Sequence, residues 1–338
     1  AEQRGADEQR DRQRARDSDH YILPMREVPK GGKAPSSTYG ASPRAASGPA
    51  PIVSPKLPSM HGRVCVITGA SRGIGKATAR QLAALGATVG MLCRDPTRGA
   101  EAVADVRNAT GNADVHLLVA DLASFDSIRG VAREVASRWP ALHVLVNNAG
   151  VSRAHRTVTV DGLEATFVVN HLAPFLLTHD LLPVLQAGAP SRVVTVTSVF
   201  ERWGRIAFDD LQSERRYNGT RAYLQSKLAN VLFSLGLAER LKGTGVTSIC
   251  AFPGLVATDL LREYWWWRVR WLRPVWRRIF DSADEAGGTV VYAACAEGVT
   301  EGCYAGGRRV SSSRRSYDRG LQERLWAISE ELTGARGS

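Results

Sequence analysis

Short apolar runs alternate with longer amphipathic stretches along the chain from His61 onward. Because the apolar runs are rich in Val, Ile and Leu and show no polar alternation, we expect strands that are buried on both faces. The runs predicted as strands are Val64–Thr68, Thr88–Cys93, Val115–Val119, Leu142–Asn147, Arg192–Thr197 and Thr247–Phe252. The stretches predicted as helices are 73–85, 97–109, 124–138, 161–187, 221–242 and 282–296. This alternation predicts one α/β domain, a doubly wound parallel sheet covered by helices on both faces.

Residues 1–60 differ from the rest, because no helical or strand period persists there. They hold eight of the fifteen prolines, with ten basic and seven acidic side chains, which is the composition of an extended segment. We therefore expect an extended Pro/Arg/Ser-rich arm over 1–60, one domain over 61–310 with a lid at 255–280, and a C-terminal tail over 311–338. The start at Ala1 rather than Met indicates a mature protein whose targeting peptide has been removed. The arm could bind a protein partner or fold back onto its own domain.

Composition narrows the class further. The chain has 338 residues, a net charge of +11 and 44% hydrophobic residues, which excludes a disordered or collagen-like protein. No stretch approaches the roughly 18 uncharged apolar residues of a membrane-spanning helix. The five cysteines are widely spaced without a CxxC pair, so we expect buried free thiols and neither a disulfide framework nor a metal site. The excess of positive charge leaves nucleic acid, an anionic membrane and an acidic cofactor as candidate ligands.

A glycine-rich turn, TGASRGIG, joins the first predicted strand to the first predicted helix. Glycines permit a tight turn and a close backbone approach, and the helix N-terminus offers N–H groups and a positive dipole end to a pyrophosphate. The strand–turn–helix context favours a nucleotide site over a purely structural turn. The candidate phosphate-binding residues are Gly69, Ser71, Arg72, Gly73, Ile74 and Gly75.

The second predicted strand ends at Cys93, followed by Arg94 and Asp95. In dinucleotide-binding folds an acid at this place holds the ribose 2′-hydroxyl, whereas an Arg accommodates a 2′-phosphate. Arg94 and Arg72 together favour NADP(H) over NAD(H), with Asp95 as a rival ribose ligand.

Tyr223 and Lys227 stand four residues apart in a predicted helix and therefore share one face. A free Tyr has a pKa of about 10, and a Lys ammonium one turn away favours the phenolate form that proton transfer needs. The alternative is an ordinary Tyr and Lys on a surface helix. Ser198, at the end of the fifth predicted strand, and Asn170, in the fourth helix, accompany them.

With these residues the chain resembles the short-chain dehydrogenase/reductase family, whose fold is of the Rossmann type. The resemblance runs from about Gly62 to about Val310 and implies a catalytic tetrad of Asn170, Ser198, Tyr223 and Lys227. It also implies that Tyr223 exchanges a proton with the substrate oxygen, that Ser198 orients this oxygen, and that Lys227 holds the nicotinamide ribose. Besides Tyr223 and Lys227, the cofactor contacts that it implies are Asp121, Leu122, Asn148, Ala149, Gly150, Pro253, Gly254 and Thr258.

Several segments are similar to the retinol dehydrogenase-like branch, which lies near the light-dependent protochlorophyllide reductases. They are VVNHLAPFLLT, YLQSKLANVLFSLGLAERL, FPGLVATDLLR and EAGGTVVYAA. Ala173-Pro174 and Phe252 depart from the branch pattern and could reshape the substrate cleft. The resemblance implies an NADP(H)-dependent oxidoreductase acting on a lipophilic carbonyl or alcohol of retinoid, steroid or quinone type.

The segment Tyr264–Phe280 holds five of the eight tryptophans among several arginines. Trp at headgroup depth and Arg on lipid phosphate favour membrane contact, and a plain substrate lid or a protein interface are alternatives. Nothing else supports nucleic-acid binding. We therefore expect a peripheral membrane protein in an organelle, a mitochondrion rather than a chloroplast. The alternative function is an accessory subunit of a large organellar membrane complex that retains NADPH as a structural ligand.

Overall fold

The computed structural model describes residues 57–254 and 282–335 of the chain. Within these residues eight strands form a single sheet in the order β3-β2-β1-β4-β5-β6-β7-β8, and every neighbouring pair is parallel except β7 and β8. The strands are β1 (Val64–Thr68), β2 (Thr88–Cys93), β3 (Val115–Val119), β4 (Val144–Asn147), β5 (Ser191–Val196), β6 (Val246–Ala251), β7 (Gly302–Ala305) and β8 (Arg308–Val310). The expected doubly wound parallel sheet is confirmed.

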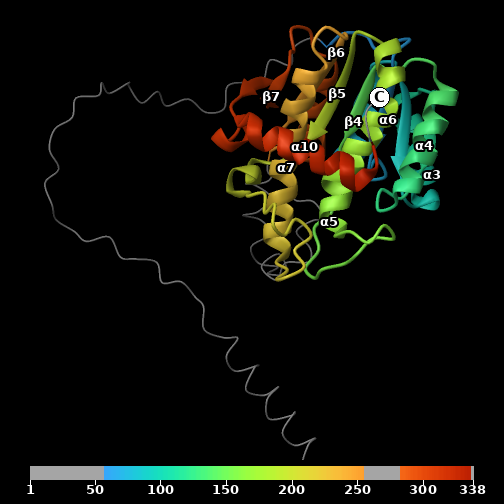
Figure 1. Cartoon of the computed structure of the whole chain (residues 1–338). Helices are drawn as coiled ribbons and strands as arrows, with labels where there is room; N and C mark the ends of the chain where they lie inside the picture. Colours follow the sequence, from blue (N-terminus) through green and yellow to red (C-terminus); the bar gives the residue numbers. More distant parts are fainter. Residues whose placement is uncertain (1–56, 255–281, 336–338) are drawn as a thin grey trace, which may run out of the picture. The chain divides into compact units, whose positions relative to one another are not determined.

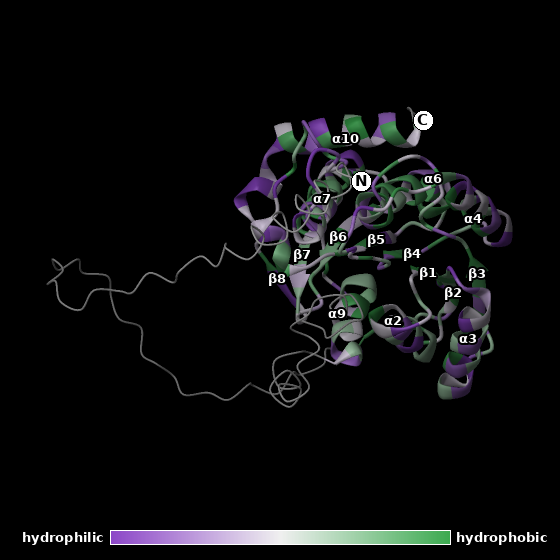
Figure 2. Ribbon diagram, turned by 90° about the horizontal axis from the view of Figure 1, so that it is seen from below, coloured by the Kyte–Doolittle hydropathy of each residue, from purple (hydrophilic) through white to green (hydrophobic). Residues whose placement is uncertain are grey.

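Helices cover both faces of this sheet (Figure 2). One face carries α2 (Gly73–Ala84), α3 (Pro96–Thr110) and α9 (Ala283–Cys295), and the other carries α4 (Phe125–Arg138), α6 (Ala173–Ala187), α7 (Gly219–Arg240) and α10 (Arg319–Thr333). Each face has its own apolar core, one built around Ile67 and Met91 and the other around Phe167 and Phe175. Because the strands are covered on both sides, their Val, Ile and Leu side chains are almost all buried.

The predicted helix over 161–187 is divided in the structure. Glu164 precedes the short helix α5 (Ala165–Phe167) and its carboxylate accepts from the backbone N–H groups of Thr166 and Phe167 at 2.8 and 2.7 Å, so the helix begins later than expected. A π-helical turn, η1 (Val168–Leu172), then leads into α6. Such turns displace the local hydrogen-bond register and are frequent at functional sites.

Among the described residues, one helical run, Ala165–Ala187, is long and apolar enough to cross a membrane. The sequence patterns had predicted no membrane-spanning helix. However, 67% of its apolar window is buried inside the fold. That burial is what a core helix shows, so the run is weak evidence for a membrane span.

The C-terminal part contains elements that the sequence patterns did not identify. Strands β7 and β8 extend the sheet, the 3₁₀-helix η6 (Arg314–Tyr317) follows, and α10 lies across α7 (Figure 1). Asp318 caps α10 by accepting from the Leu321 N–H at 3.1 Å, and Leu325 reaches the core. Most of the segment expected as a tail is therefore packed against the domain.

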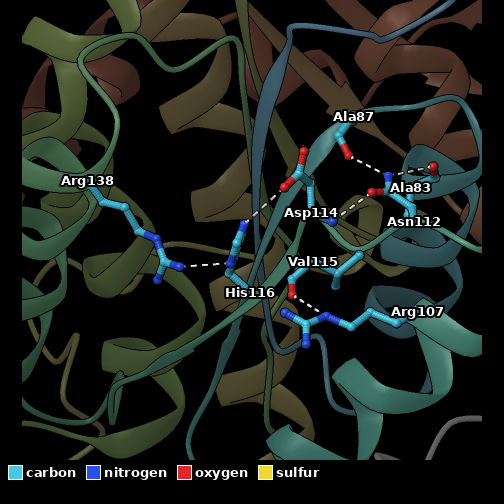
Figure 3. Close-up of polar contacts among 8 residues, drawn as sticks. All are labelled: Ala83, Ala87, Arg107, Asn112, Asp114, Val115, His116 and Arg138. Carbon is cyan, nitrogen blue, oxygen red and sulfur yellow. Dashed lines mark hydrogen bonds and ion pairs between the residues drawn. The ribbon is translucent and has the colours of Figure 1, made fainter.

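Polar contacts secure β3 at its amino end, the end opposite the one that carries the candidate site (Figure 3). Asn112 donates to the carbonyl oxygens of Ala83 and Ala87, each at 2.9 Å, and Arg107 donates to that of Val115 at 2.9 Å. His116 lies 2.7 Å from an Arg138 nitrogen, and partial burial together with Arg138 lowers the pKa of this imidazole. These contacts tie α2, α3 and α4 to the edge of the sheet.

All five cysteines are buried free thiols, as expected. Burial raises the pKa of Cys93 and of Cys295 to about 11, so both stay protonated and unreactive near neutral pH.

Two predicted segments lie outside the described residues. They are the arm, apart from residues 57–60, and the whole predicted lid, which includes Thr258 and Tyr264–Phe280.

Candidate active site

The order of the sheet reverses between β1 and β4, both of which pair in parallel. At such a switch point the loops leave neighbouring strands in opposite directions and open a crevice at the carboxyl ends. The glycine-rich turn follows β1, Asn148–Gly150 follow β4, and Ser198 follows β5. The structure thus brings the three predicted groups to adjacent strand ends.

The beginning of the glycine-rich turn packs closely against the turn after β4, which leaves no room for a side chain at Gly69. Gly69 has φ +66°, and a Cβ there would stand 2.9 Å from the Cα of Ala149. Asn148 donates its side-chain amide to the Thr68 carbonyl at 2.8 Å, and the Thr68 hydroxyl accepts from the N–H groups of Asn148 and Ala149 at 2.9 Å each. The turns after β1 and β4 are therefore locked together.

The start of α2 suits an anionic ligand. Arg72 occupies the N-cap position of α2 and makes no side-chain capping bond to the first N–H groups of the helix. Arg72 and Gly73 are exposed, Ser71 and Ile74 are half-buried, and a Cβ on Gly73 would meet nothing within 4 Å. Open space above a helix N-terminus fits the pyrophosphate that the turn predicts.

Asp95, the rival ribose ligand, has a structural role. Its carboxylate caps α3 by accepting from the Arg98 N–H at 3.1 Å, and it lies 3.6 Å from the Arg98 guanidinium. Arg94 is exposed just after β2, which is the neighbour of β1 in the sheet. The two arginines therefore follow adjacent strand ends, as a 2′-phosphate site would require.

The third strand contributes Asp121 and Leu122. The Asp121 carboxylate accepts from the Ala123 N–H at 3.0 Å, which shapes the turn before α4, and Leu122 is buried. On the other side of the site, Pro253 is buried and Gly254 has φ +85°. The contacts of these residues with a cofactor stay predictions.

Asn170 lies fully buried in the π-helical turn η1. Its Oδ1 accepts from the Val151 N–H at 2.7 Å, and its Nδ2 donates to the Val151 carbonyl and to the Ser226 hydroxyl, both at 2.9 Å. Asn170 thus joins the loop after β4 to α7. A Cβ on Gly150 would stand 3.5 Å from Asn170 Oδ1 and 3.6 Å from Lys227 Nζ, so these groups lie around the same point.

Lys227 and Tyr223 share one face of α7, as their spacing predicts. The Lys227 ammonium lies 5.7 Å from the centroid of the Tyr223 ring and donates to the Val196 carbonyl at 3.3 Å. Lys227 is 5% exposed, and this burial lowers its pKa to about 8. A buried ammonium with one backbone acceptor retains capacity for two further hydrogen bonds, which the hydroxyl groups of a ribose can take.

Ser198 lies at the carboxyl end of β5, where it caps the 3₁₀-helix η2 (Val199–Trp203). Its Oγ accepts from the Phe200 N–H at 3.4 Å, and 8% of the residue is exposed. The preceding Thr197 donates its hydroxyl to the Lys227 carbonyl at 3.0 Å. This bond fastens the serine-bearing strand to the helix that carries Tyr223 and Lys227.

The sequence motifs did not mark two residues that organise the site, Thr68 and Glu201, as functional candidates. Thr68 was recognised as part of the glycine-rich turn, but its hydroxyl also holds the turn after β4. Glu201 has no local sequence signal, because its partners come from the C-terminal part of the chain.

A nucleotide cradle beside a Tyr–Lys pair, a serine and an asparagine defines an NAD(P)(H)-dependent oxidoreductase. The family model described as short chain dehydrogenase matches residues 63–268. The chain belongs to the short-chain dehydrogenase/reductase family, which confirms the resemblance, and it acts on alcohol or carbonyl groups.

Curated relatives and solved structures agree with this assignment. Human retinol dehydrogenase 12 is 44% identical over 280 residues, covering 82% of this chain and 88% of the relative. Mouse polyprenol dehydrogenase is 43% identical over 298 residues, covering 84% and 87%. A Mycobacterium paratuberculosis protein has a TM-score of 0.68 at 37% identity, covering 82% of this chain and 96% of that one. A Burkholderia cenocepacia short-chain dehydrogenase in complex with NADP has a TM-score of 0.58 at 27% identity, covering 74% and 98%.

Proposed function

We propose that this protein transfers hydride between NADP(H) and a lipophilic alcohol or carbonyl of retinoid, steroid or quinone type. The observation that carries the proposal is the convergence of Lys227, Asn170 and Gly150 beside Tyr223 on α7. The names of the relatives, retinol dehydrogenase and polyprenol dehydrogenase, support an apolar substrate. The preference for NADP(H) is supported by Arg72 and Arg94, and by the use of Asp95 as a helix cap.

In the proposed mechanism, the bound nicotinamide supplies or accepts the hydride. The Tyr223 hydroxyl gives a proton to the carbonyl oxygen during reduction and takes it back during alcohol oxidation. Lys227 binds the nicotinamide ribose and, as an ammonium, favours the phenolate form of Tyr223. Ser198 donates to the substrate oxygen and holds it within reach of Tyr223.

Asn170 acts by holding the site together and by maintaining a proton path to solvent. Its amide fixes the loop after Gly150 against the helix that carries Tyr223, through Val151 and Ser226. The remaining proposed cofactor ligands are Gly69, Ser71, Gly73, Ile74, Gly75, Asp121, Leu122, Asn148, Ala149, Pro253, Gly254 and Thr258.

We further propose peripheral membrane contact through Tyr264–Phe280, a segment outside the described residues. It would place the protein where an apolar substrate dissolves. The mitochondrial location and the accessory-subunit alternative rest on residues 1–60 and on that same segment, and they stay predictions.

The proposal is tested with the purified full chain and a panel of carbonyls in detergent, followed by the loss of NADPH absorbance. We expect turnover of at least one large apolar carbonyl, such as a retinaldehyde or a steroid ketone, and little turnover of acetaldehyde. NADH should support a lower kcat/KM than NADPH. Absence of turnover with every carbonyl, and with the corresponding alcohols and NADP, would contradict the proposal.

A further inference from the structure

Glu201 is a fully buried carboxylate three residues after Ser198. The carboxylate accepts three hydrogen bonds, and all three donors belong to two consecutive serines near the C-terminus. Oε1 accepts from the Ser312 hydroxyl at 2.8 Å and from the Ser313 N–H at 3.0 Å, and Oε2 accepts from the Ser313 hydroxyl at 2.7 Å. Among the described residues no basic side chain forms an ion pair with it. Because a buried charge is costly without partners, these bonds hold Glu201 strongly in place.

Two further contacts flank this carboxylate. Arg202 donates to the Ser311 carbonyl at 3.1 Å, and Arg315 donates to the Gly204 carbonyl at 2.9 Å. Residues 311–315, here called the C-terminal clasp, therefore contact Glu201 and Arg202 of η2 and its C-cap residue Gly204. Ser198 is the N-cap residue of η2, and its carbonyl accepts from the Glu201 N–H at 3.0 Å.

The clasp leads directly into α10, which packs on α7 (Figure 1). Gln322 of α10 donates to the Ser316 carbonyl at 2.7 Å, and the Arg240 guanidinium of α7 lies 3.9 Å from the centroid of the Trp326 indole. Ser329 of α10 lies 2.9 Å from His171, the residue after Asn170. One continuous C-terminal segment thus contacts the elements that carry Ser198, Tyr223 and Asn170.

We propose that Glu201 is a positioning residue for Ser198 and that the C-terminal clasp sets the placement of the serine hydroxyl relative to Tyr223. This inference rests on the proposed function, because it assigns Ser198 the substrate oxygen. A carboxylate with three hydrogen bonds of 2.7–3.0 Å cannot shift without leaving donors unpaired, so η2 and its N-cap residue Ser198 are fixed relative to the clasp, which continues into α10. The glycine-rich turn follows β1 whereas Ser198 follows β5, so we expect the clasp to affect the chemical step more than the affinity for NADPH.

The test separates positioning from stability with three variants of the full chain. Glu201→Ala removes the acceptor and leaves buried donors unpaired, so both the melting temperature and kcat should fall. The triple variant Glu201→Ala/Ser312→Ala/Ser313→Ala removes both sides of the side-chain contact, which restores much of the stability. Because the triple variant still lacks the hydrogen bonds between Glu201 and the C-terminal clasp, its kcat should remain about 10- to 100-fold below that of wild type. Glu201→Gln keeps an acceptor oxygen and should retain most of kcat.

One further measurement and one control variant show whether the loss of kcat is specific to η2. The Kd for NADPH should change by less than about twofold in all three variants, because none of the substituted residues lies in the glycine-rich turn after β1 or on α7. Glu323→Gln is the matched control, since it breaks the exposed Arg240–Glu323 ion pair that also joins α7 to α10 but does not touch η2. This control should keep the wild-type kcat.

Recovery of kcat together with stability in the triple variant would overturn the clasp proposal, as would a wild-type kcat in folded Glu201→Ala. Failure of the proposed function has a different signature. In that case wild type shows no turnover, or Ser198→Ala is as active as wild type.

Discussion

A Cβ atom on Gly75 would stand 2.5 Å from the carbonyl oxygen of Gly69, so the first turn of α2 touches the end of β1 with no room for a side chain. The same Cβ would lie 2.5 Å from the Asn148 amide nitrogen, which itself donates to the Thr68 carbonyl. The close approach therefore links the glycine-rich turn to the turn after β4. It explains physically why a glycine stands at this position.

Gly75→Ala should destabilise the fold by about 1–3 kcal/mol, because the methyl group forces α2 away from β1 and disturbs the turn. Denaturant unfolding measures this loss, and NADPH fluorescence titration should show strongly weakened binding. Gly130→Ala in α4 is the matched control, since a Cβ there meets nothing within 4 Å. That variant should be neutral or stabilised by about 0.5–1 kcal/mol. Wild-type stability and NADPH affinity in Gly75→Ala would contradict this account.

Arg94→Ala should lower kcat/KM for NADPH by about 10- to 100-fold and leave that for NADH nearly unchanged, because a charge-assisted bond to the 2′-phosphate is lost. Steady-state kinetics with both cofactors measure the ratio. Asp95→Ala serves as the control, because it removes the cap of α3 and costs about 1 kcal/mol of stability. Its cofactor preference should stay that of wild type. A shift of preference in Asp95→Ala but not in Arg94→Ala would reverse the assignment.

The reaction should slow at alkaline pH because Lys227 must carry a proton. Burial lowers its pKa to about 8, so the ammonium is present at neutral pH and is lost as the pH rises through that value. The pH profile of kcat/KM, which reports groups of the free enzyme, should therefore fall above about pH 8. Lys227→Arg stays protonated, so any alcohol oxidation that it retains, where Tyr223 accepts the proton, should lack this descending limb. A wild-type profile that stays flat up to about pH 10 would argue against the role of Lys227.

Acid should destabilise the protein through His171. Burial lowers the pKa of this imidazole from 6.5 to about 3, so the folded state stays neutral where the unfolded state binds a proton. The unfolding free energy must then fall as the pH drops from about 6.5 to about 3. Urea unfolding at a series of pH values measures this slope, which should be reduced in His171→Gln. The exposed His155→Gln is the control and should keep the wild-type slope.

How far the sequence predicts this structure depends on where the determining contacts lie. Strands β1, β2 and β3 begin and end at the predicted residues, because a mostly apolar run between turns is a local signal. The glycine-rich turn and the Tyr223–Lys227 pair are also local patterns. The family resemblance that these patterns carry also predicted Asn170 and Ser198 as site residues, and the structure brings both to the same edge of the sheet.

The parts that escaped prediction depend on distant contacts or on weak patterns. Strand β8 has three residues, two of them exposed arginines, and no apolar run marks it. The π-helical turn holds Asn170, whose amide contacts Val151 in a loop earlier in the chain, and the partners of Glu201 are serines that lie more than one hundred residues away in sequence. Helix α10 did carry a signal, with Asp318 as a cap and apolar residues at 321, 325, 328 and 332, and a pattern search of that segment would have found it.

Hydride transfer in Tyr223→Phe is the measurement that tests the central claim most directly. In a single-turnover experiment with saturating NADPH and the best carbonyl of the panel, the wild type should oxidise the cofactor. The variant should bind NADPH with nearly unchanged Kd but transfer hydride about 100- to 10,000-fold more slowly, because only the proton donor is lost. A variant that reacts as fast as wild type would contradict the assignment of Tyr223 and the mechanism built on it.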